Sequence, residues 1–204
     1  MVSIDSEPLR VLLVSPIESH FVWWSEDSER VYFIQEERGY KALQLRVADA
    51  KTGATRKILE EHGPTYLELN LIFWVKPNVR VLSAGSEIIW FSERDGWAHL
   101  YLYDGNTGKL KNRIVSGTMV VRDIIFVDEA KRWLYFTGCG QEKNRDPYFK
   151  HLYRVKLDGS DLELLTPENA NHEVTFSPSG RYFVDTYSRV DSVPLTVLHF
   201  RQES

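Results

Sequence analysis

The chain has 204 residues, 43% of them hydrophobic and 13% aromatic, and this composition excludes an intrinsically disordered protein. Its formal net charge of -4 provides no overall positive field for nucleic acid, and its apolar runs at 11–14 and 71–75 are far shorter than the roughly 20 residues of a membrane span. The single cysteine, Cys139, excludes an intramolecular disulfide and a multi-cysteine zinc site. None of these features selects among a periplasmic, secreted or cytoplasmic location.

Strands are predicted along the whole chain, because aromatic and β-branched residues are abundant and no amphipathic helical pattern of about 12 residues occurs. Polar or glycine-containing turns separate the strands. In chain order, the predicted strands are residues 9–14, 21–24, 31–34, 42–45, 56–59, 79–82, 88–91, 99–102, 110–115, 121–127, 133–137, 151–154, 161–165, 173–176, 181–185 and 195–200.

An adjacent aromatic pair recurs along the chain in equivalent predicted strands. The pairs begin at positions 32, 90, 135 and 182, so that about 45 to 58 residues separate successive pairs. After each of the first three pairs comes a strand with alternating apolar residues, and it ends at a glycine that can adopt the positive φ of a hairpin turn. These glycines are Gly53, Gly108 and Gly159. The common register indicates a repeated four-stranded antiparallel meander.

A repeated meander of this kind is typical of the blades of a β-propeller. We therefore expect residues 1–204 to form one partial, all-β propeller domain of about three to four blades, at 9–62, 66–117, 119–168 and 170–204, with the last blade incomplete. So few blades do not close a ring, which predicts that the chain is a fragment. Open strand edges and an exposed apolar face in turn predict a homodimer.

Residues 89–103, Ile-Trp-Phe-Ser-Glu-Arg-Asp-Gly-Trp-Ala-His-Leu-Tyr-Leu-Tyr, resemble the blade signature of the dipeptidyl-peptidase IV family of serine peptidases, in the prolyl oligopeptidase clan. Segments 151–155, 157–159, 164–166 and 176–185 resemble the final blades of the same N-terminal propeller. The resemblance implies an eight-bladed propeller joined to a C-terminal α/β-hydrolase domain that removes dipeptides from peptide N-termini, often after proline. It implies that hydrolase domain and peptide substrates as partners, and no cofactor.

The nucleophile elbow Gly-x-Ser-x-Gly of α/β-hydrolases does not occur in the 204 residues, so no catalytic residue is assigned. We expect the non-catalytic propeller portion of a serine-type dipeptidyl aminopeptidase, which gates substrate access to a hydrolase domain outside this chain. The alternative is a stand-alone propeller of the tricorn or translocation-protein kind, which binds peptides or proteins without catalysis.

The turn that follows the second aromatic pair is interpreted as a structural blade motif. Carboxylates and an arginine beside a left-handed glycine usually tie a hairpin to its neighbour, and a binding site is the alternative. The motif consists of Ser92, Glu93, Arg94, Asp95, Gly96, Trp97, His99, Leu100 and Tyr101.

Two pairs of adjacent glutamates are also interpreted as structural. The resemblance implies that paired glutamates elsewhere in the family's propeller hold the substrate's α-ammonium group. Glu36 and Glu37, however, occupy the same place in their blade as residues 92–97 do in the next, which predicts a blade turn. Glu60 and Glu61 are predicted to form a solvated strand end.

Lys76 is the one candidate for a substrate-binding residue, because related propellers bring a loop from this stretch toward the substrate channel. The alternative is a surface lysine that precedes Pro77. In the insertion at 138–150, Tyr148 and Phe149 either face a partner or pack under their own loop.

The six histidines are scattered and lack the spacings that metal sites favour, so no metal site is predicted. His99 and His151 occupy equivalent blade positions, which predicts a packing or hydrogen-bonding role. Cys139 is predicted to be an unreactive thiol.

Overall fold

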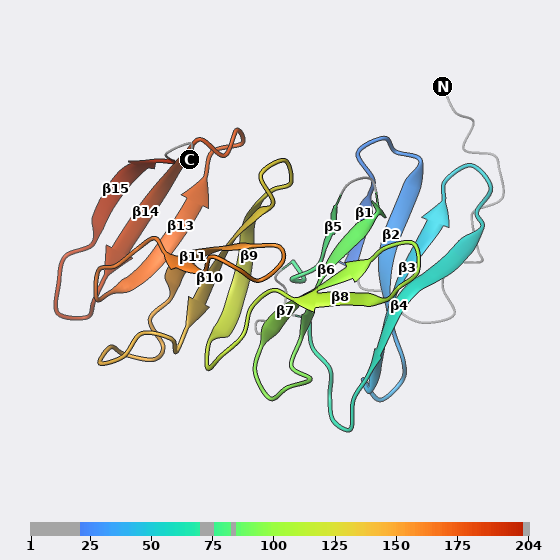
Figure 1. The fold of residues 1–204 in the computed structure, drawn as a ribbon, viewed down its shortest axis with the longest axis horizontal. Helices are drawn as coiled ribbons and strands as arrows, with labels where there is room; N and C mark the ends of the chain where they lie inside the picture. The colour runs from blue at the N-terminus through green and yellow to red at the C-terminus, as the bar shows by residue number, and fades with distance from the viewer. Residues whose placement is uncertain (1–20, 70–75, 83–84, 202–204) are drawn as a thin grey trace.

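A computed structural model of the chain describes residues 21–69, 76–82 and 85–201. These residues form fifteen β-strands in four antiparallel sheets and contain no α-helix (Figure 1). The predicted all-β fold, an incomplete β-propeller, is confirmed. The predicted strand at 9–14 lies outside the described residues. Within the part of the chain that is described, no helix has the length and apolar character needed to cross a bilayer.

Each sheet is a meander in which every strand pairs with the next one along the chain. We call the four sheets blades 1 to 4. Blade 1 contains β1 (Val22–Trp24), β2 (Arg30–Glu36), β3 (Ala42–Asp49) and β4 (Thr55–His62); blade 2 contains β5 (Arg80–Leu82), β6 (Glu87–Ser92), β7 (His99–Asp104) and β8 (Leu110–Arg113); blade 3 contains β9 (Val120–Asp128), β10 (Trp133–Cys139), β11 (His151–Lys156) and β12 (Glu163–Leu164); blade 4 contains β13 (Asn171–Phe176), β14 (Tyr182–Ser188) and β15 (Leu195–Phe200).

Two outer strands are shorter than the sequence predicts. Strand β8 ends at Arg113, because the amides of Ile114 and Val115 both donate to the carbonyl of Leu100, which ends the regular ladder. Strand β12 contains only Glu163 and Leu164. Part of the reason is that Asp161 has a φ of 56°, which is incompatible with an extended strand.

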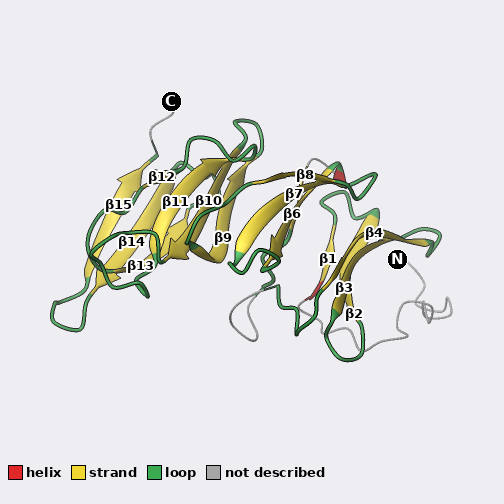
Figure 2. Ribbon diagram, turned by 60° about the horizontal axis from the view of Figure 1, so that its bottom comes forward, coloured by secondary structure: helices red, strands yellow, loops and turns green. Residues whose placement is uncertain are grey.

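The four blades stand face to face in an open row (Figures 1 and 2). A hydrophobic cluster fills each interface between neighbouring blades. One cluster joins blades 1 and 2, a second joins blades 2 and 3, and a smaller third joins blades 3 and 4. A buried blade is therefore apolar on both faces, which explains why β6 is buried along its whole length.

The recurring aromatic pairs supply these interfaces, because neighbouring residues of a strand point to opposite faces. Trp90 packs in the cluster with blade 1, whereas Phe91 packs in the cluster with blade 3. In blade 3 the order is reversed, since Tyr135 faces blade 4 and Phe136 faces blade 2. The pairs thus recur in sequence, but blade 2 differs from blade 3 by one residue in register.

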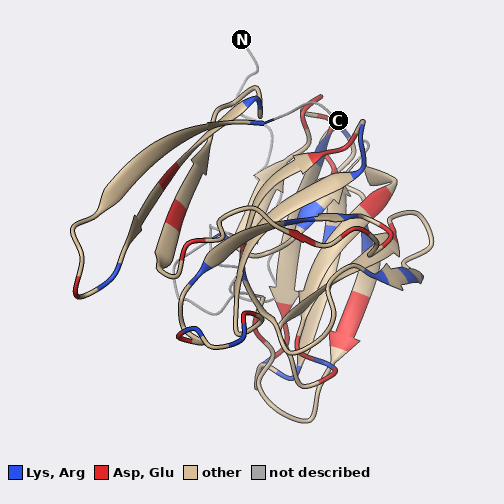
Figure 3. Cartoon of the chain, turned by 60° about the vertical axis from the view of Figure 1, so that its left-hand side comes forward, with Lys and Arg blue, Asp and Glu red and all other residues tan. Residues whose placement is uncertain are grey.

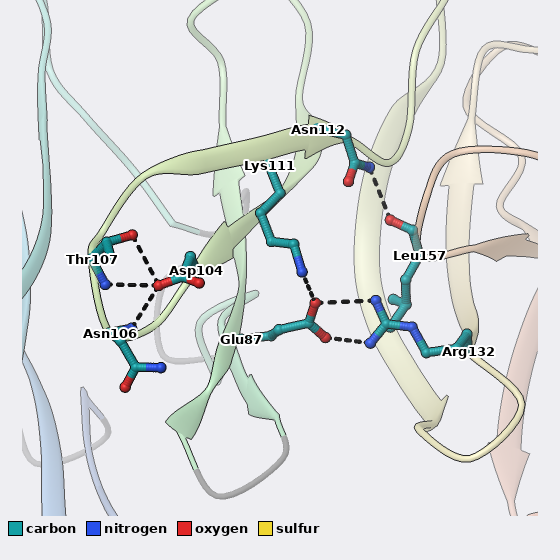
Figure 4. Close-up of polar contacts among 8 residues, drawn as sticks. All are labelled: Glu87, Asp104, Asn106, Thr107, Lys111, Asn112, Arg132 and Leu157. Atoms are coloured by element: carbon teal, nitrogen blue, oxygen red, sulfur yellow. Dashed lines mark hydrogen bonds and ion pairs between the residues drawn. The ribbon is translucent and has the colours of Figure 1, made fainter.

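Polar contacts tie blade 2 to blade 3 at the end of the sheets where the first and second strands connect (Figure 4). The carboxylate of Glu87 in β6 accepts hydrogen bonds from Lys111 in β8 and from Arg132, which precedes β10. Next to it, the side-chain amide of Asn112 donates to the carbonyl of Leu157 over 2.9 Å. Acidic and basic residues are interspersed along the strands and turns (Figure 3).

The predicted glycine turns have the expected positive φ at Gly53, Gly108 and Gly159. The backbone also passes very close to the neighbouring blade at two of them. A Cβ atom on Gly108 would lie 2.1 Å from the carbonyl oxygen of Ile58, and one on Gly159 would lie 2.8 Å from that of Arg113. In blades 2 and 3, the turn between the third and fourth strands therefore packs directly against the outer strand of the preceding blade.

Candidate functional site

The candidate motif lies at the turn between β6 and β7. Ser92 ends β6, and His99 begins β7. Gly96 has a φ of 85° and donates its amide to the carbonyl of Glu93 over 2.9 Å, which closes the turn. Trp97 is 40% exposed at the tip.

A carboxylate of blade 1 accepts hydrogen bonds from residues in and next to this turn. Glu61 in β4 accepts hydrogen bonds from Trp90 Nε1 at 2.6 Å, from Arg94 Nη2 at 2.8 Å and from the Ser92 hydroxyl. The prediction that Glu61 belongs to a solvated strand end is wrong, since Glu61 is only 9% exposed. Strand alternation places its side chain on the face that blade 2 covers, whereas neighbouring Glu60 pairs with Lys57.

Arg94 connects the carboxylate to the aromatic residues of β7. Its guanidinium lies 4.4 Å from the ring centre of Tyr101 and 5.7 Å from that of Tyr103, and its Nε donates to Ser92 Oγ over 2.8 Å. Burial and the hydrogen bond to Asp95 together raise the pKa of Tyr101 to about 12. The arginine is thus held between a carboxylate and two rings.

Asp95 makes a second link in the same turn. Its Oδ2 lies 2.9 Å from His99 Nδ1 and accepts a hydrogen bond from Arg113 Nη1 at 2.9 Å. Burial works to raise the pKa of Asp95, but its hydrogen bonds to His99 and Arg113 outweigh that effect and lower it. His151, the blade 3 equivalent of His99, makes the analogous contact through Nδ1 to the carbonyl of Thr166, at 2.9 Å.

Beside the turn, a pocket of about 240 Å³ opens between blades 1 and 2. Its wall includes Glu61, Glu93 and Arg94 of the network, together with Tyr66 and Glu68 from the segment after β4. Burial raises the pKa of Tyr66 to about 12 and raises that of Glu68 above its usual value. Acidic and aromatic side chains thus lie beside leucines and Arg94 in the wall of this pocket.

The other predicted residues lie apart from this network. Lys76 is exposed, and the nearby charge of Arg80 lowers its pKa. Glu37 lies in the β2–β3 turn, where its amide donates to the carbonyl of Ala42 and its carbonyl accepts from Tyr40. Glu37 thus lies in a blade turn, as predicted, and Glu36 is the last strand residue before that turn.

The insertion places its two aromatic residues differently. Tyr148 is 84% exposed, whereas Phe149 is half-buried. Cys139 is buried at the end of β10, and its burial raises the pKa of the thiol, which disfavours a reactive thiolate.

The sequence analysis missed a buried ion pair between β13 and β14. His172 Nδ1 lies 2.9 Å and 3.1 Å from the two carboxylate oxygens of Asp185, and both residues are buried. His172 Nε2 lies 3.1 Å from the carbonyl oxygen of Glu168. Thirteen residues separate His172 from Asp185, so only the strand pairing could have revealed the contact.

The same pair bears on metal binding and on catalysis. Glu168, His172 and Asp185 bring ligand-type atoms within 4.8 Å of one another. Both nitrogens of His172 face acceptors, which fits a protonated imidazole that has no lone pair for a metal or for a general base. Among the described residues, His172 and Asp185 therefore form a structural ion pair rather than a metal or catalytic site.

Comparisons with known proteins agree with this architecture. A family model described as "Dipeptidyl peptidase IV (DPP IV) N-terminal region" matches residues 19–194. The dipeptidyl peptidase 4 of Trichophyton rubrum is 30% identical over 118 residues, which are 55% of this chain and 14% of that protein. The dipeptidyl peptidase 4 of Arthroderma otae is 32% identical over 101 residues, 47% of this chain and 12% of that protein.

A solved structure shows the same fold. The crystal structure of Porphyromonas gingivalis dipeptidyl peptidase 4 matches with a TM-score of 0.73 and 21% identity, over 88% of this chain and 24% of that one. The chain thus spans only a small part of the length of the relatives it matches. Since the family match extends over most of the sequence, the chain belongs to the family of dipeptidyl peptidase IV N-terminal regions.

Proposed function

We propose that this chain is the non-catalytic propeller portion of a serine-type dipeptidyl aminopeptidase, and that it gates the access of peptides to a C-terminal α/β-hydrolase domain of the same parent protein. The family match over residues 19–194 carries this proposal. The 204 residues contain no Gly-x-Ser-x-Gly, the motif that would place a hydrolase nucleophile within them. We further propose that the propeller region divides into four blades, with boundaries at residues 9–62, 66–117, 119–168 and 170–204.

The gating role is supported by the way the turns are held. In a meander, the connections between second and third strands all lie at one end of the sheets, along the lower side of Figure 1. In blade 2 this turn is fixed by the Glu61 and Asp95 contacts, and in blade 3 it extends into a long loop that exposes Tyr148. A rigid rim of this kind can restrict a channel to short peptides.

The first test is catalytic. The purified 204-residue chain should release no p-nitroaniline from Gly-Pro-p-nitroanilide, whereas the parent protein should release it and should be blocked by a serine-peptidase inhibitor. Turnover that resists the inhibitor and follows the 204-residue chain through purification would sink the proposal. A parent coding sequence without Gly-x-Ser-x-Gly would instead support the stand-alone peptide-binding propeller.

A substrate contact of Lys76 is tested in the parent enzyme. We expect Lys76→Ala to raise KM for dipeptide anilides with little change in kcat, because a lost ground-state contact weakens binding. Lys109→Ala is the matched control, since Lys109 is exposed at the opposite end of blade 2, in the β7–β8 turn. Equal kinetic constants for the two variants would mean that Lys76 is a surface lysine that makes no contact with the substrate.

A further inference from the structure

The loop between β10 and β11, residues 140–150, is fastened to blade 4 where it joins β11. The backbone amide of Lys150 donates to Asn171 Oδ1 over 3.1 Å, and the amide of His172 donates to the carbonyl of Lys150 over 3.0 Å. We call Lys150 and His151 the root of this loop. The contacts of the root with β13 hold the loop at the lower side of Figure 1.

Two histidine rings meet at the root. His151 begins β11, His172 lies in β13, and their ring centres are 5.1 Å apart. The two residues are 2% and 0% exposed. Two positive charges at this separation repel strongly in a site that water does not reach. The closed root therefore accommodates a charge on one of the rings but not on both.

The hydrogen-bond partners decide which ring carries the charge. His172 faces the Asp185 carboxylate with Nδ1 and the carbonyl of Glu168 with Nε2. His151 Nδ1 lies 2.9 Å from the carbonyl oxygen of Thr166, and since a carbonyl only accepts, the proton of the neutral ring is on Nδ1. Its second nitrogen, Nε2, is buried and has no hydrogen-bond partner in the described part of the chain. A proton on Nε2 would have no acceptor, so the closed root holds His151 neutral.

The groups around His151 add to this preference. Burial lowers the pKa of this ring, the bond to Thr166 opposes that effect, and the charges of His172 and Arg145 lower the pKa again. The charge of Glu142 favours a proton on the ring, but its carboxylate already accepts a hydrogen bond from a tyrosine of β11 over 3.0 Å. The titratable and charged groups around the two rings are Cys139 in β10, Glu142, Arg145 and Lys150 in the loop, Tyr153 in β11, Glu168 before β13, Glu173 in β13, and Asp185 and Tyr187 in β14. Among the described residues, none of these groups accepts a hydrogen bond from His151 Nε2.

We propose that the root is an acid-sensitive latch: a proton that Nε2 of His151 takes up from solvent shifts the root from closed on β13 to open, and so releases residues 140–150. In the open root, water solvates the new imidazolium and weakens its repulsion from His172 and Arg145. The released loop carries Tyr148, which is 84% exposed. Release is a property of the chain itself, and only its effect on the access of peptides rests on the proposed function.

The direction of the pH response follows from proton linkage. The closed root disfavours the proton that an exposed histidine binds below pH 6.5, so the open form gains as the pH falls. The ratio of open to closed root should rise by up to about tenfold for each pH unit, until the pH reaches the closed-state pKa of His151. His172 keeps its proton over this range, since its own pKa is raised above 6.5. The response therefore reports on His151 rather than on His172.

Amide hydrogen exchange of the full 204-residue chain between pH 6.5 and pH 5 tests the proposal. After correction for the intrinsic pH dependence of exchange, protection of the amides of Lys150, Leu152 and His172 should fall by up to about tenfold per pH unit, whereas protection in β3 of blade 1 should stay constant. His151→Gln keeps a side-chain amide to donate to the carbonyl that the imidazole bonds but takes up no proton, so its root should stay protected at pH 5. His62→Gln, which replaces an exposed histidine of blade 1, is the matched control and should respond as the native chain does.

An NMR titration of the native chain tests the mechanism without a substitution. The His151 ring should titrate below pH 6.5, and the loss of root protection should level off where it does so. Unchanged root protection between pH 6.5 and pH 5, an equal loss in His151→Gln, or a His151 ring that titrates above pH 6.5 would each overturn the proposal. None of these measurements uses peptidase activity, so their outcome is independent of the proposed function.

Discussion

Glu61 of β4 accepts a hydrogen bond from the indole nitrogen of Trp90 in β6 over 2.6 Å, and this contact joins two sheets. The same carboxylate pairs with Arg94 at 2.8 Å. The buried acid thus neutralises the arginine and satisfies the indole at the interface between blades 1 and 2.

Glu61→Leu should destabilise the chain strongly. The substitution leaves the Trp90 indole, the Ser92 hydroxyl and the Arg94 guanidinium without their carboxylate, and loss of one partner of a buried pair costs about 3–5 kcal/mol. Urea unfolding monitored by tryptophan fluorescence measures the loss. Glu60→Leu removes the neighbouring, more exposed acid and should change the free energy of unfolding by less than about 1 kcal/mol. Equal losses at the two positions would contradict the interface role of Glu61.

Glu87 should make blade packing sensitive to acid. The hydrogen bond from Arg132 lowers the pKa of Glu87, burial opposes this, and Lys111 lowers it again, so that the net pKa lies below 4.5. A carboxylate with a lowered pKa stabilises the folded chain above pH 4.5, and this contribution disappears as the pH falls through the folded-state pKa.

Glu87→Gln is therefore expected to cost about 1–3 kcal/mol at pH 7 and progressively less below pH 4.5. Unfolding free energies of both proteins, measured from pH 7 down to the acid transition, test this expectation. Glu163→Gln breaks an exposed pair with Arg154 in blade 3 and serves as the control. A constant difference between native and Glu87→Gln protein across this range would exclude the ion pair as its cause.

The local part of this structure was predictable from sequence. Strand alternation and the glycines at 53, 108 and 159 fix meanders and turns through neighbouring residues alone. The contacts that could not be predicted are those that a residue makes with the adjacent blade. Glu61 belongs to a charged strand end by its sequence context, and only the approach of Trp90 and Arg94 from blade 2 makes it a buried acceptor.

The aromatic pairs illustrate the same limit. Their recurrence located the blades, but a strand has two faces, and a shift of one residue exchanges them. Trp90 faces the preceding blade, whereas Tyr135, also the first residue of its pair, faces the following one. The contact of His172 with Asp185 was equally hidden, because strand register brings these residues together.

His172 should titrate above the usual range of histidine. Burial alone lowers the pKa of His172, but the hydrogen bonds to Asp185 and to the carbonyl of Glu168 outweigh burial and raise it above 6.5. A histidine with a raised pKa contributes stability that is complete below pH 6.5 and is lost as the pH rises through the folded-state pKa.

We therefore expect the free-energy difference between the native chain and His172→Gln to shrink from mildly acidic to alkaline pH. Asp185→Asn should lower the histidine pKa, and NMR titration of the ring protons measures that shift directly. It should also cost about 3–5 kcal/mol at pH 6, because it leaves a buried imidazolium without its counter-ion. A His172 resonance that titrates below pH 6.5 in the native chain would contradict this account.

Two glycines with similar φ separate backbone strain from close packing between blades. Gly108 and Gly96 have φ values of 69° and 85°, so alanine at either position should cost about 1–2 kcal/mol for the left-handed conformation. At Gly96, nothing lies within 4 Å of the added Cβ, whereas at Gly108 it would lie 2.1 Å from the carbonyl oxygen of Ile58. Gly108→Ala must therefore push blade 2 away from blade 1 and should cost a further ~1–3 kcal/mol. Thermal unfolding of both variants measures the difference, and equal midpoints would mean that the two blades do not meet at this turn in solution.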